Sequence, residues 1–407
     1  MNDVHQTATN APLVLSSTQP FDYDVTIVGA GPVGLALAGW LARRSATQQL
    51  SVALIDAREP EDSIADPRAI AVSHGSRMIL EPLRWPSDAT AIQRIHVSQR
   101  GHFGRTLIDH AEHGLPALGY VLRYGSIVHA LAEAVRTTPA HWFKSTKAQP
   151  PQQLEDDDGV LLPIESAHVT RTLRTRILVN AEGGLFGEQQ AGAGATRDYG
   201  QTALVGTVTL SAPQPHVAWE RFTSQGPIAL LPMGGVRGAD YALVWCCAPE
   251  QAARRAQLSD EDFLRELSAE FGDRMGRFTQ IKGRAAFPLG LNTVDTLVKG
   301  SVVAIGNAAQ TLHPVAGQGL NLGLRDAHAL ADALSHYGAT RSALAAFARR
   351  RALDRRMTIG ATDTLARLFT IDFPPLATLR GLALTALEFV PPVKTALARQ
   401  MMFGQRR

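Results

Sequence analysis

Apolar runs near the start of the chain predict the first unit of regular structure. Residues 24–28 form a short apolar run that leads straight into the glycine-rich turn at 29–34. Small and apolar residues continue to Arg44 with the spacing of a helix packed closely on a sheet, and residues 51–55 supply another apolar run. Strand, glycine turn, helix and strand in this order predict a βαβ unit in a parallel sheet.

The pattern changes between about residues 201 and 288, where apolar and polar positions alternate and glycine turns separate the runs. Such alternation predicts a mainly antiparallel sheet. One helix should interrupt this sheet, because Ser259 followed by Asp262 resembles a capping box in front of an apolar face.

A second α/β pattern begins with the apolar run at 302–306, and apolar residues then recur at helical spacing from Leu320 to Leu334. Beyond Arg341 the chain should be helical, with proline pairs breaking its end. The dense arginines between 349 and 356 are expected to form a solvated or salt-bridged helix face, with binding of anionic lipid or of the NADPH phosphate as the alternative.

The first glycine turn has the spacing that a dinucleotide needs. Gly29 allows the tight turn, Gly31 lets the backbone approach a pyrophosphate, and Gly34 allows the helix to pack closely. The helix N-terminus then faces the phosphates. Asp56 ends the next strand, where a carboxylate can accept hydrogen bonds from a ribose diol. These residues predict a dinucleotide site without choosing between NAD and FAD.

A glycine-rich segment in the second half of the chain favours FAD. Asn307 follows the strand at 302–306 and is expected near the ribityl chain or the pyrophosphate. Gly317 and Gly319 allow backbone N–H groups to approach a planar ring, and the next helix would direct its positive end at that ring. The candidate cofactor residues of this segment are Asn307, Pro314, Gly317, Gln318, Gly319 and Asn321.

The glycine turn, the segment 66–73 and the stretch 314–323 together resemble the class A flavin-dependent aromatic hydroxylases, and the resemblance extends over most of the chain. Within that group the sequence most closely resembles the ubiquinone-biosynthesis hydroxylases, and among them the 2-octaprenyl-6-methoxyphenol hydroxylase branch. Asn307 and Gln310 carry much of this preference, because most of the group has Asp and His there. Further support comes from residues 96–102, 226–233 and 243–246.

The resemblance also implies roles for single residues. Arg68 would contact the flavin phosphates or the ribityl chain, with a surface ion pair as the alternative. Arg123 is a second cofactor candidate, balanced against a purely structural place near a helix start. Glu182 stands where the family has an Asp that serves the pyrophosphate, and the usual Ser and Arg downstream are missing. His313 is expected beside the flavin, as a proton relay or as a structural group. No catalytic base is identified.

The implied fold class is α/β: a Rossmann-like FAD-binding domain interleaved with a smaller substrate domain on a mainly antiparallel sheet, followed by a C-terminal helical segment. A chain of 407 residues has room for these two domains. The expected boundaries are 22–96, 118–200 and 285–350 for the FAD-binding domain, 97–117 and 201–284 for the substrate domain, 351–407 for the helical region, and 1–21 for a disordered extension.

The resemblance implies a reaction in which FAD takes a hydride from NAD(P)H and then reacts with O2. The resulting flavin C4a-hydroperoxide would hydroxylate a polyprenylated methoxyphenol, a lipid-like aromatic precursor of ubiquinone. Two alternatives stay open. One is a hydroxylase of a small soluble aromatic, and the other is a non-hydroxylating flavoprotein, either a reductase or an assembly component.

Composition narrows the partners and the location. A formal net charge of +3 and its spread along the chain argue against nucleic acid. The two cysteines are adjacent, which suits neither an ordinary disulfide nor a zinc site, so we expect no metal and a reducing compartment. No apolar run reaches the length of a membrane span, and the polar N-terminus matches no targeting signal.

The apolar residues between Leu365 and Val390 are abundant enough to pack on the enzyme, on a partner or on a membrane surface. We therefore expect a cytoplasmic protein that rests at the inner face of the cell membrane or joins a ubiquinone-biosynthesis complex. The formation of a homo-oligomer is left open.

Overall fold

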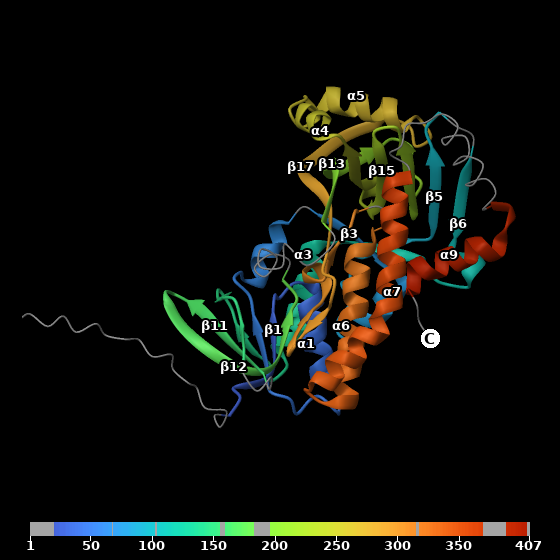
Figure 1. The fold of residues 1–407 in the computed structure, drawn as a ribbon. Helices are drawn as coiled ribbons and strands as arrows, with labels where there is room; N and C mark the ends of the chain where they lie inside the picture. Colours follow the sequence, from blue (N-terminus) through green and yellow to red (C-terminus); the bar gives the residue numbers. More distant parts are fainter. Residues whose placement is uncertain are drawn as a thin grey trace, which may run out of the picture.

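The computed structural model describes residues 20–66, 68–101, 104–154, 159–182, 196–314, 317–368 and 388–404. Three predictions concern segments mostly outside these ranges: the N-terminal extension, the departure after Glu182, and the apolar tail between residues 369 and 387. Two large sheets organise the described residues, with long helices beside the lower one and short helices above the upper one (Figure 1).

The lower sheet has nine strands within the described residues and a parallel centre. β1 pairs in parallel with β2 and β12, and β12 also pairs in parallel with β19. The path runs β10 (Gln152–Gln153), β11 (Val160–Ser166), β12 (Val169–Asn180), β1 (Tyr23–Val28), β2 (Val52–Ile55) and β8 (His141–Phe143), with β9 (Lys147–Ala148), β18 (Val298–Lys299) and β19 (Val302–Ala304) beside it. Its carboxyl edge is the expected place for a dinucleotide.

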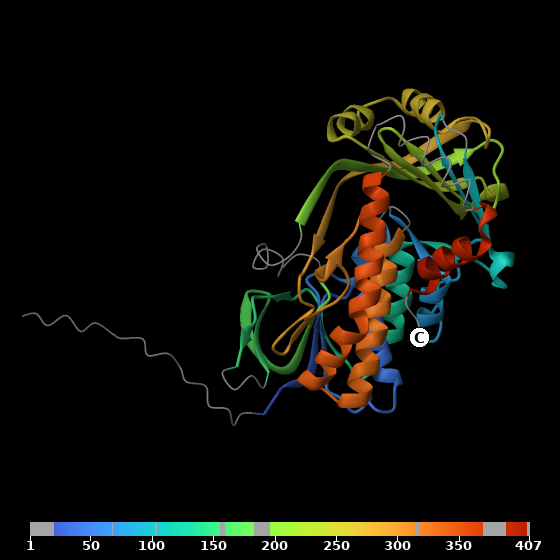
Figure 2. The same cartoon turned by 45° about the vertical axis from the view of Figure 1, so that its right-hand side comes forward.

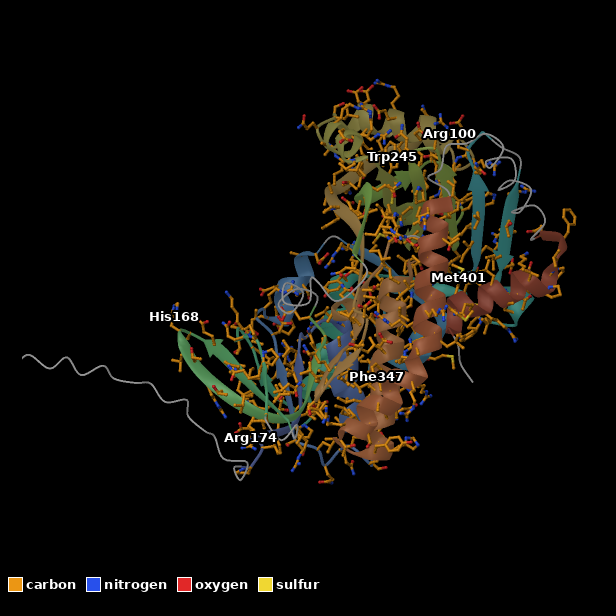
Figure 3. The ribbon with its side chains drawn as sticks, in the orientation of Figure 1. Arg100, His168, Arg174, Trp245, Phe347 and Met401 are labelled. Atoms are coloured by element: carbon orange, nitrogen blue, oxygen red, sulfur yellow. The ribbon has the colours of Figure 1, made fainter. Side chains whose placement is uncertain are left out.

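Four helices pack beside this sheet: α1 (Pro32–Arg43), α3 (Tyr124–Arg136), α6 (Gln318–Tyr337) and α7 (Arg341–Leu368). Figure 2 shows the long helices α6 and α7 lying side by side next to α1. Apolar side chains of β1, α1, α3 and α6 form one buried core, which Phe347 of α7 joins (Figure 3). This packing fixes the helix N-termini relative to the strand ends.

The upper sheet has eight strands in the described part of the chain, and all its pairings are antiparallel except the one between β14 and β5. In order these are β20 (Gln310–Thr311), β17 (Phe278–Thr293), β13 (Thr196–Leu210), β16 (Asp240–Cys247), β15 (Gly226–Gly234), β14 (Val217–Thr223), β5 (Arg94–Gln99) and β6 (Arg105–Asp109). This confirms the α/β class with a second, mainly antiparallel sheet.

Two helices, α4 (Pro249–Ala256) and α5 (Asp260–Phe271), cover the outer face of the upper sheet, so the prediction of a single helix there was wrong (Figure 1). α4 begins at Pro249, which suits the first position of a helix. The cap of α5 is confirmed, because the Ser259 hydroxyl accepts a hydrogen bond from the Asp262 N–H.

A small three-stranded sheet of β3 (Ala69–Ser73), β7 (Gly119–Arg123) and β4 (Thr90–Ile92) lies between the two large sheets. Beside it are α2 (His74–Leu80) and α9 (Pro391–Phe403). Short 3-10 turns complete the described elements: η1 (Pro60–Ala65), η2 (His110–His113), η3 (Val236–Gly238) and η4 (Gly306–Ala308).

The arginine run of α7 is only partly a surface feature. Arg351 is buried and forms ion pairs with Asp326 at 2.7 Å and Asp354 at 2.6 Å, and Asp354 also binds Arg325 at 2.9 Å. We call these four residues the buried charge cluster. Arg351 is salt-bridged, as the sequence predicts, but its ion pairs are buried against α6 and do not lie on a solvent-facing side of α7.

Candidate cofactor site

Steric constraints explain the glycines of the first turn. Gly29 has a φ of +104°, and a Cβ there would lie 2.9 Å from the carbonyl carbon of Ala181. A Cβ on Gly34 would lie 1.9 Å from the carbonyl oxygen of Gly29, so the helix reaches the turn only without a side chain. Gly31 is the N-cap of α1, and Pro32 follows at the first helical position. The turn therefore presents the start of α1 at the end of β1.

Asp56 holds this turn in place. Its buried carboxylate accepts hydrogen bonds from the Ala30 N–H at 2.6 Å and the Arg58 N–H at 2.8 Å. Asp56 directly follows β2, next to β1 in the parallel sheet. The carboxylate thus lies beside the turn, where the sequence predicts the ribose contact.

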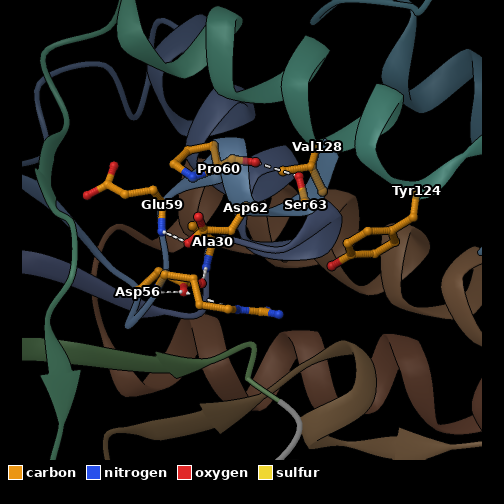
Figure 4. Close-up of a pocket in the computed structure, with 9 residues that line it drawn as sticks. Ala30, Asp56, Glu59, Pro60, Asp62, Ser63, Tyr124 and Val128 are labelled. Carbon is orange, nitrogen blue, oxygen red and sulfur yellow. Dashed lines mark hydrogen bonds and ion pairs between the residues drawn. The ribbon is translucent and has the colours of Figure 1, made fainter. Parts of the chain in front are cut away.

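A small cavity opens next to Asp56 (Figure 4). Its wall combines the glycine turn, the segment after β2 and the start of α3. The lining residues are Ala30, Asp56, Arg58, Glu59, Pro60, Asp62, Ser63, Tyr124 and Val128. Sequence reasoning found Asp56 and missed the others, although the position of Arg58 and Glu59 directly after Asp56 was a usable signal.

Arg68 and Arg123 lie at the end of the small sheet nearest this cavity. The Arg68 side chain pairs with Asp66 through bonds of 2.6 to 3.1 Å and stacks over the Tyr124 ring, 4.6 Å from its centroid. Arg123 is exposed, ends β7 and forms the N-cap of α3. Ala69 and Arg123 are register partners, which brings the two arginines close together beside Tyr124.

Glu182 lies beside the glycine turn at the end of β12. Its N–H donates to the Asn180 side chain at 3.0 Å, and its backbone contacts the position where a Gly29 Cβ would be. Burial raises the pKa of Glu182, and the nearby Asp56 carboxylate raises it further. The Glu182 carboxylate therefore takes up a proton at a higher pH than an exposed Glu does.

Asn307 follows β19 within η4 and is exposed. The preceding Gly306 has a φ of +61°, and a Cβ there would lie 3.2 Å from Val33 of α1. Since β2, β1, β12 and β19 are parallel neighbours, Asp56, Gly29, Glu182 and Asn307 all lie at one sheet edge. The fold brings together four of the predicted residues that are far apart in the sequence.

The remaining predicted residues belong to the loop of residues 306–314 and 317–319, which we call the flavin loop, and to the start of α6. Gly317 caps α6 with a φ of +59°, and its N–H donates to the carbonyl of Pro314 at 2.9 Å. The Gln318 side chain donates to the Met401 carbonyl of α9 at 3.3 Å. Gly319 faces open space, since a Cβ there would meet no atom within 4 Å.

Asn321 fastens the flavin loop to the small sheet. Its amide oxygen accepts from the Ser73 N–H at 2.8 Å, and its amide nitrogen donates to the carbonyls of Ala71 at 3.0 Å and Gly317 at 2.7 Å. Asn321 is buried. Its side chain therefore shapes the loop through contacts with the backbone.

Gln310 and His313 face inward. The Gln310 amide donates to Asp326 at 2.9 Å, and its oxygen accepts from Arg355 at 2.8 Å, so Gln310 joins the flavin loop to the buried charge cluster. His313 is hydrogen bonded to Gln201 of β13 at 3.0 Å, and burial lowers its pKa to about 4. The imidazole is therefore neutral near pH 7.

The inner face of the upper sheet lies next to the flavin loop. Alternate residues of its strands pack on α4 and α5, and the residues between them turn inward. We call eight half-buried residues of this inward side the open face: Ile95, Val97, Val205, Glu220, Ala229, Leu231, Met233 and Val244. The polar residues Thr207, Thr209 and Asp240 also turn inward on β13 and β16. One end of the open face packs on Ala71 of β3, and Ala71 is also the residue nearest to a Cβ on Gly317.

These residues fit an extended dinucleotide such as FAD. The Asp56 carboxylate suits a ribose diol, the glycine turn at the start of α1 suits the pyrophosphate, and the open space at Gly319 suits the approach of a flat ring. When bound, FAD supplies the electron transfer that the side chains cannot perform.

The comparisons with known proteins agree with this geometry. Residues 22–356 match the family described as an FAD binding domain. The chain is 32% identical over 394 residues to the ubiquinone hydroxylase UbiL of Rhodospirillum rubrum, covering 93% of this chain and 89% of that protein. It is 30% identical over 386 residues to the 3-demethoxyubiquinol 3-hydroxylase of Escherichia coli, covering 90% of this chain and 94% of that protein.

A solved structure shares the fold. The p-nitrophenol 4-monooxygenase PnpA of Pseudomonas putida matches with a TM-score of 0.73 at 16% identity, covering 94% of this chain and 99% of that chain. The family match confirms FAD as the cofactor, with the NAD(P)H and O2 that are typical of this family. The chain therefore belongs to the FAD-dependent aromatic hydroxylases, on the branch that includes the ubiquinone-biosynthesis hydroxylases.

Proposed function

We propose that this enzyme hydroxylates a polyprenylated methoxyphenol on the route to ubiquinone, through a flavin C4a-hydroperoxide. The reaction consumes one phenol, one O2, one NAD(P)H and one proton, and it yields the hydroxylated phenol, NAD(P)+ and water. The names of the relatives from Rhodospirillum rubrum and Escherichia coli support a ubiquinone precursor as substrate. The 2-octaprenyl-6-methoxyphenol hydroxylase branch remains the specific assignment we favour.

The observation that carries this proposal is the open face next to the flavin loop. Seven of its eight residues are apolar, and they are half-buried while the opposite side of the same strands is closed by α4 and α5. An apolar surface beside the flavin excludes water, which would otherwise release hydrogen peroxide without hydroxylating the ring. It also suits an aromatic ring carrying a prenyl chain better than it suits a charged substrate.

The C-terminal region supports a contact with a membrane surface. The inward side of α9 buries Ala398 and Met402, while its outward side exposes Val393 by 52% and Leu397 by 40%. No helix in the described ranges is long and apolar enough to cross a bilayer. We propose a peripheral position at the inner face of the cell membrane, where a prenylated phenol partitions. A ubiquinone-biosynthesis complex and a homo-oligomer stay as further proposals for the same surface.

The assignment of the reaction is tested with the purified protein. We expect a flavin absorption spectrum that bleaches with NADPH under anaerobic conditions, and a product that gains one ¹⁸O atom when ¹⁸O2 and a prenylated methoxyphenol are supplied. A short, unprenylated phenol is the control substrate and should react more slowly. Equal turnover of the short phenol would favour a small soluble substrate, and bleaching without oxygen insertion would favour a reductase or an assembly component.

A further inference from the structure

Glu220 breaks the apolar pattern of the open face. On β14, the side chains of Val217 and Trp219 join the core under α4 and α5, whereas Ala218 joins the contact with the small sheet. Successive side chains of a strand point to opposite faces, so Glu220 points inward with Ala218. Its register partners are Val97 on β5 and Ala229 on β15, which are both apolar and half-buried.

Nothing in the structure explains this carboxyl as a structural group. Glu220 makes no hydrogen bond or ion pair with any described residue, and its half-buried carboxyl stands among apolar register partners. Burial alone raises the pKa of Glu220 to about 8. An unpaired acid with a pKa near the working pH has the properties of a general acid or base.

The position of Glu220 relative to the flavin loop follows from two links. The turn after β14 ends at Gly226, and the carbonyl of Gln225 in that turn accepts from Gln201 at 3.2 Å. Gln201 is in turn hydrogen bonded to His313 of the flavin loop at 3.0 Å. At the other side, Ala218 packs in the group that contains Ala71, which lies beside Gly317. Glu220 lies on β14 between these two links.

We propose that Glu220 is the catalytic base that accepts the proton of the substrate's phenol hydroxyl, an inference that rests on the function proposed above. The phenol O–H bond breaks and its proton forms an O–H bond with the carboxylate, while the electron pair stays on the phenolate oxygen. Electron density then moves into the ring and makes the attacked carbon more nucleophilic. After oxygen insertion, the ring carbon releases its hydrogen as a proton to solvent, and the ring regains its phenolate form. Glu220 then returns its own proton to the phenolate, so no proton is gained or lost at Glu220.

Among the titratable groups around Glu220, only Glu220 itself is expected to change its charge near neutral pH. Cys246 on β16 is buried, and burial raises the pKa of its thiol well above the usual range. His313 has a pKa lowered to about 4 by burial. Asp240 shares the inward side of β16 by register but binds Thr209 at 2.9 Å, and Lys282 lies on β17 with three strands between it and β14.

The test compares Glu220→Gln with the wild type under saturating substrate. We expect hydroxylation to slow by about 100-fold or more, while FAD content and the thermal midpoint stay unchanged and consumed NADPH appears as hydrogen peroxide. The wild-type rate should rise with pH and level off above about 8, and this step should be missing in Glu220→Gln. Glu220→Asp keeps a carboxylate and should keep the step at a lower rate.

Fluorinated phenols give a second readout, because they ionise without help. Fluorination should therefore raise the hydroxylation rate of Glu220→Gln by a larger factor than it raises the rate of the wild type. Glu270→Gln is the matched control, since Glu270 lies on α5 at the outer face, paired with Arg100, and it should leave rate and pH profile unchanged. Retention of the pH step and of coupling in Glu220→Gln would overturn the assignment of Glu220 alone, whereas a wild type that hydroxylates no phenol would overturn the proposed function and this inference together.

Discussion

Replacement of Asp354 by Asn should cost this protein much of its stability. In the buried charge cluster, Asp326 and Asp354 face Arg325 and Arg351, and all four side chains are at most 6% exposed. The two carboxylates balance the two guanidinium groups. Asp354→Asn leaves two buried positive charges beside one negative charge, and breaking such a pair by removing one partner costs about 3 to 5 kcal/mol.

The free energy of unfolding can be measured by urea titration followed by tryptophan fluorescence, with FAD at saturation. Glu261→Gln is the matched control, because Glu261 and its partner Arg265 on α5 are 88% and 68% exposed. Such an exposed pair contributes about 1 kcal/mol or less. If Asp354→Asn unfolds within about 1 kcal/mol of the wild type, the cluster is not the electrostatic unit described here.

A double variant separates lost charge from lost packing. Arg325→Met with Asp354→Leu removes one positive and one negative charge and leaves Arg351 paired with Asp326. Apolar replacement of a buried pair is often neutral or stabilising, so we expect the double variant to recover most of the loss. Failure to recover would show that the hydrogen bond of Arg325 to Thr358, or the shape of the site, matters more than charge balance.

Two further predictions concern the flavin loop and α9. Asn321→Ala removes three hydrogen bonds to the backbone, each worth about 1 kcal/mol, and should weaken FAD binding by about tenfold or more in a fluorescence titration of the apoprotein. An unchanged affinity would show that the loop keeps its shape without Asn321. Val393→Asp with Leu397→Asp should reduce co-sedimentation with lipid vesicles, whereas Val169→Asp, at a valine of β12 that is even more exposed, should not. Equal binding of both variants would exclude α9 as the membrane contact.

The glycine turn and the two-sheet fold were predictable because their causes are local. A positive φ at Gly29 and the contact of Gly34 with the turn require glycine whatever the rest of the chain does. The alternation of apolar residues likewise separated the parallel from the antiparallel sheet before any contact was known. The sequence did not predict Tyr124 in the cavity wall, because α3 reaches Asp56 only through the packing of the whole lower sheet.

The burial of charged residues was harder to predict from the sequence, because it depends on how the elements pack against one another. Whether Arg351 meets water or Asp326 depends on the rotation of α7 against α6, and a run of arginines gives no sign of that rotation. Glu220 went unnoticed because Val217–Thr223 has apolar residues and a charged residue on each side, so the sequence pattern does not show which side α5 covers. The usable signal was a lone carboxylate within a strand predicted to be half-buried, since such a group needs a partner or a task.

The two halves of the site differ in how they are built, and this difference bears on specificity. The cofactor end is built from backbone at the ends of β1, β2, β12 and β19. Such a site binds the part common to all dinucleotides and does not by itself distinguish one dinucleotide from another. The proposed substrate end uses side chains of an antiparallel sheet, where every second residue can change without disturbing the core under α4 and α5. Substitutions at Leu231 or Val244 should therefore alter which phenol binds while FAD binding persists. Of the two carboxyls on that face, Asp240 is paired with Thr209, whereas Glu220 has no hydrogen-bond partner among the described residues.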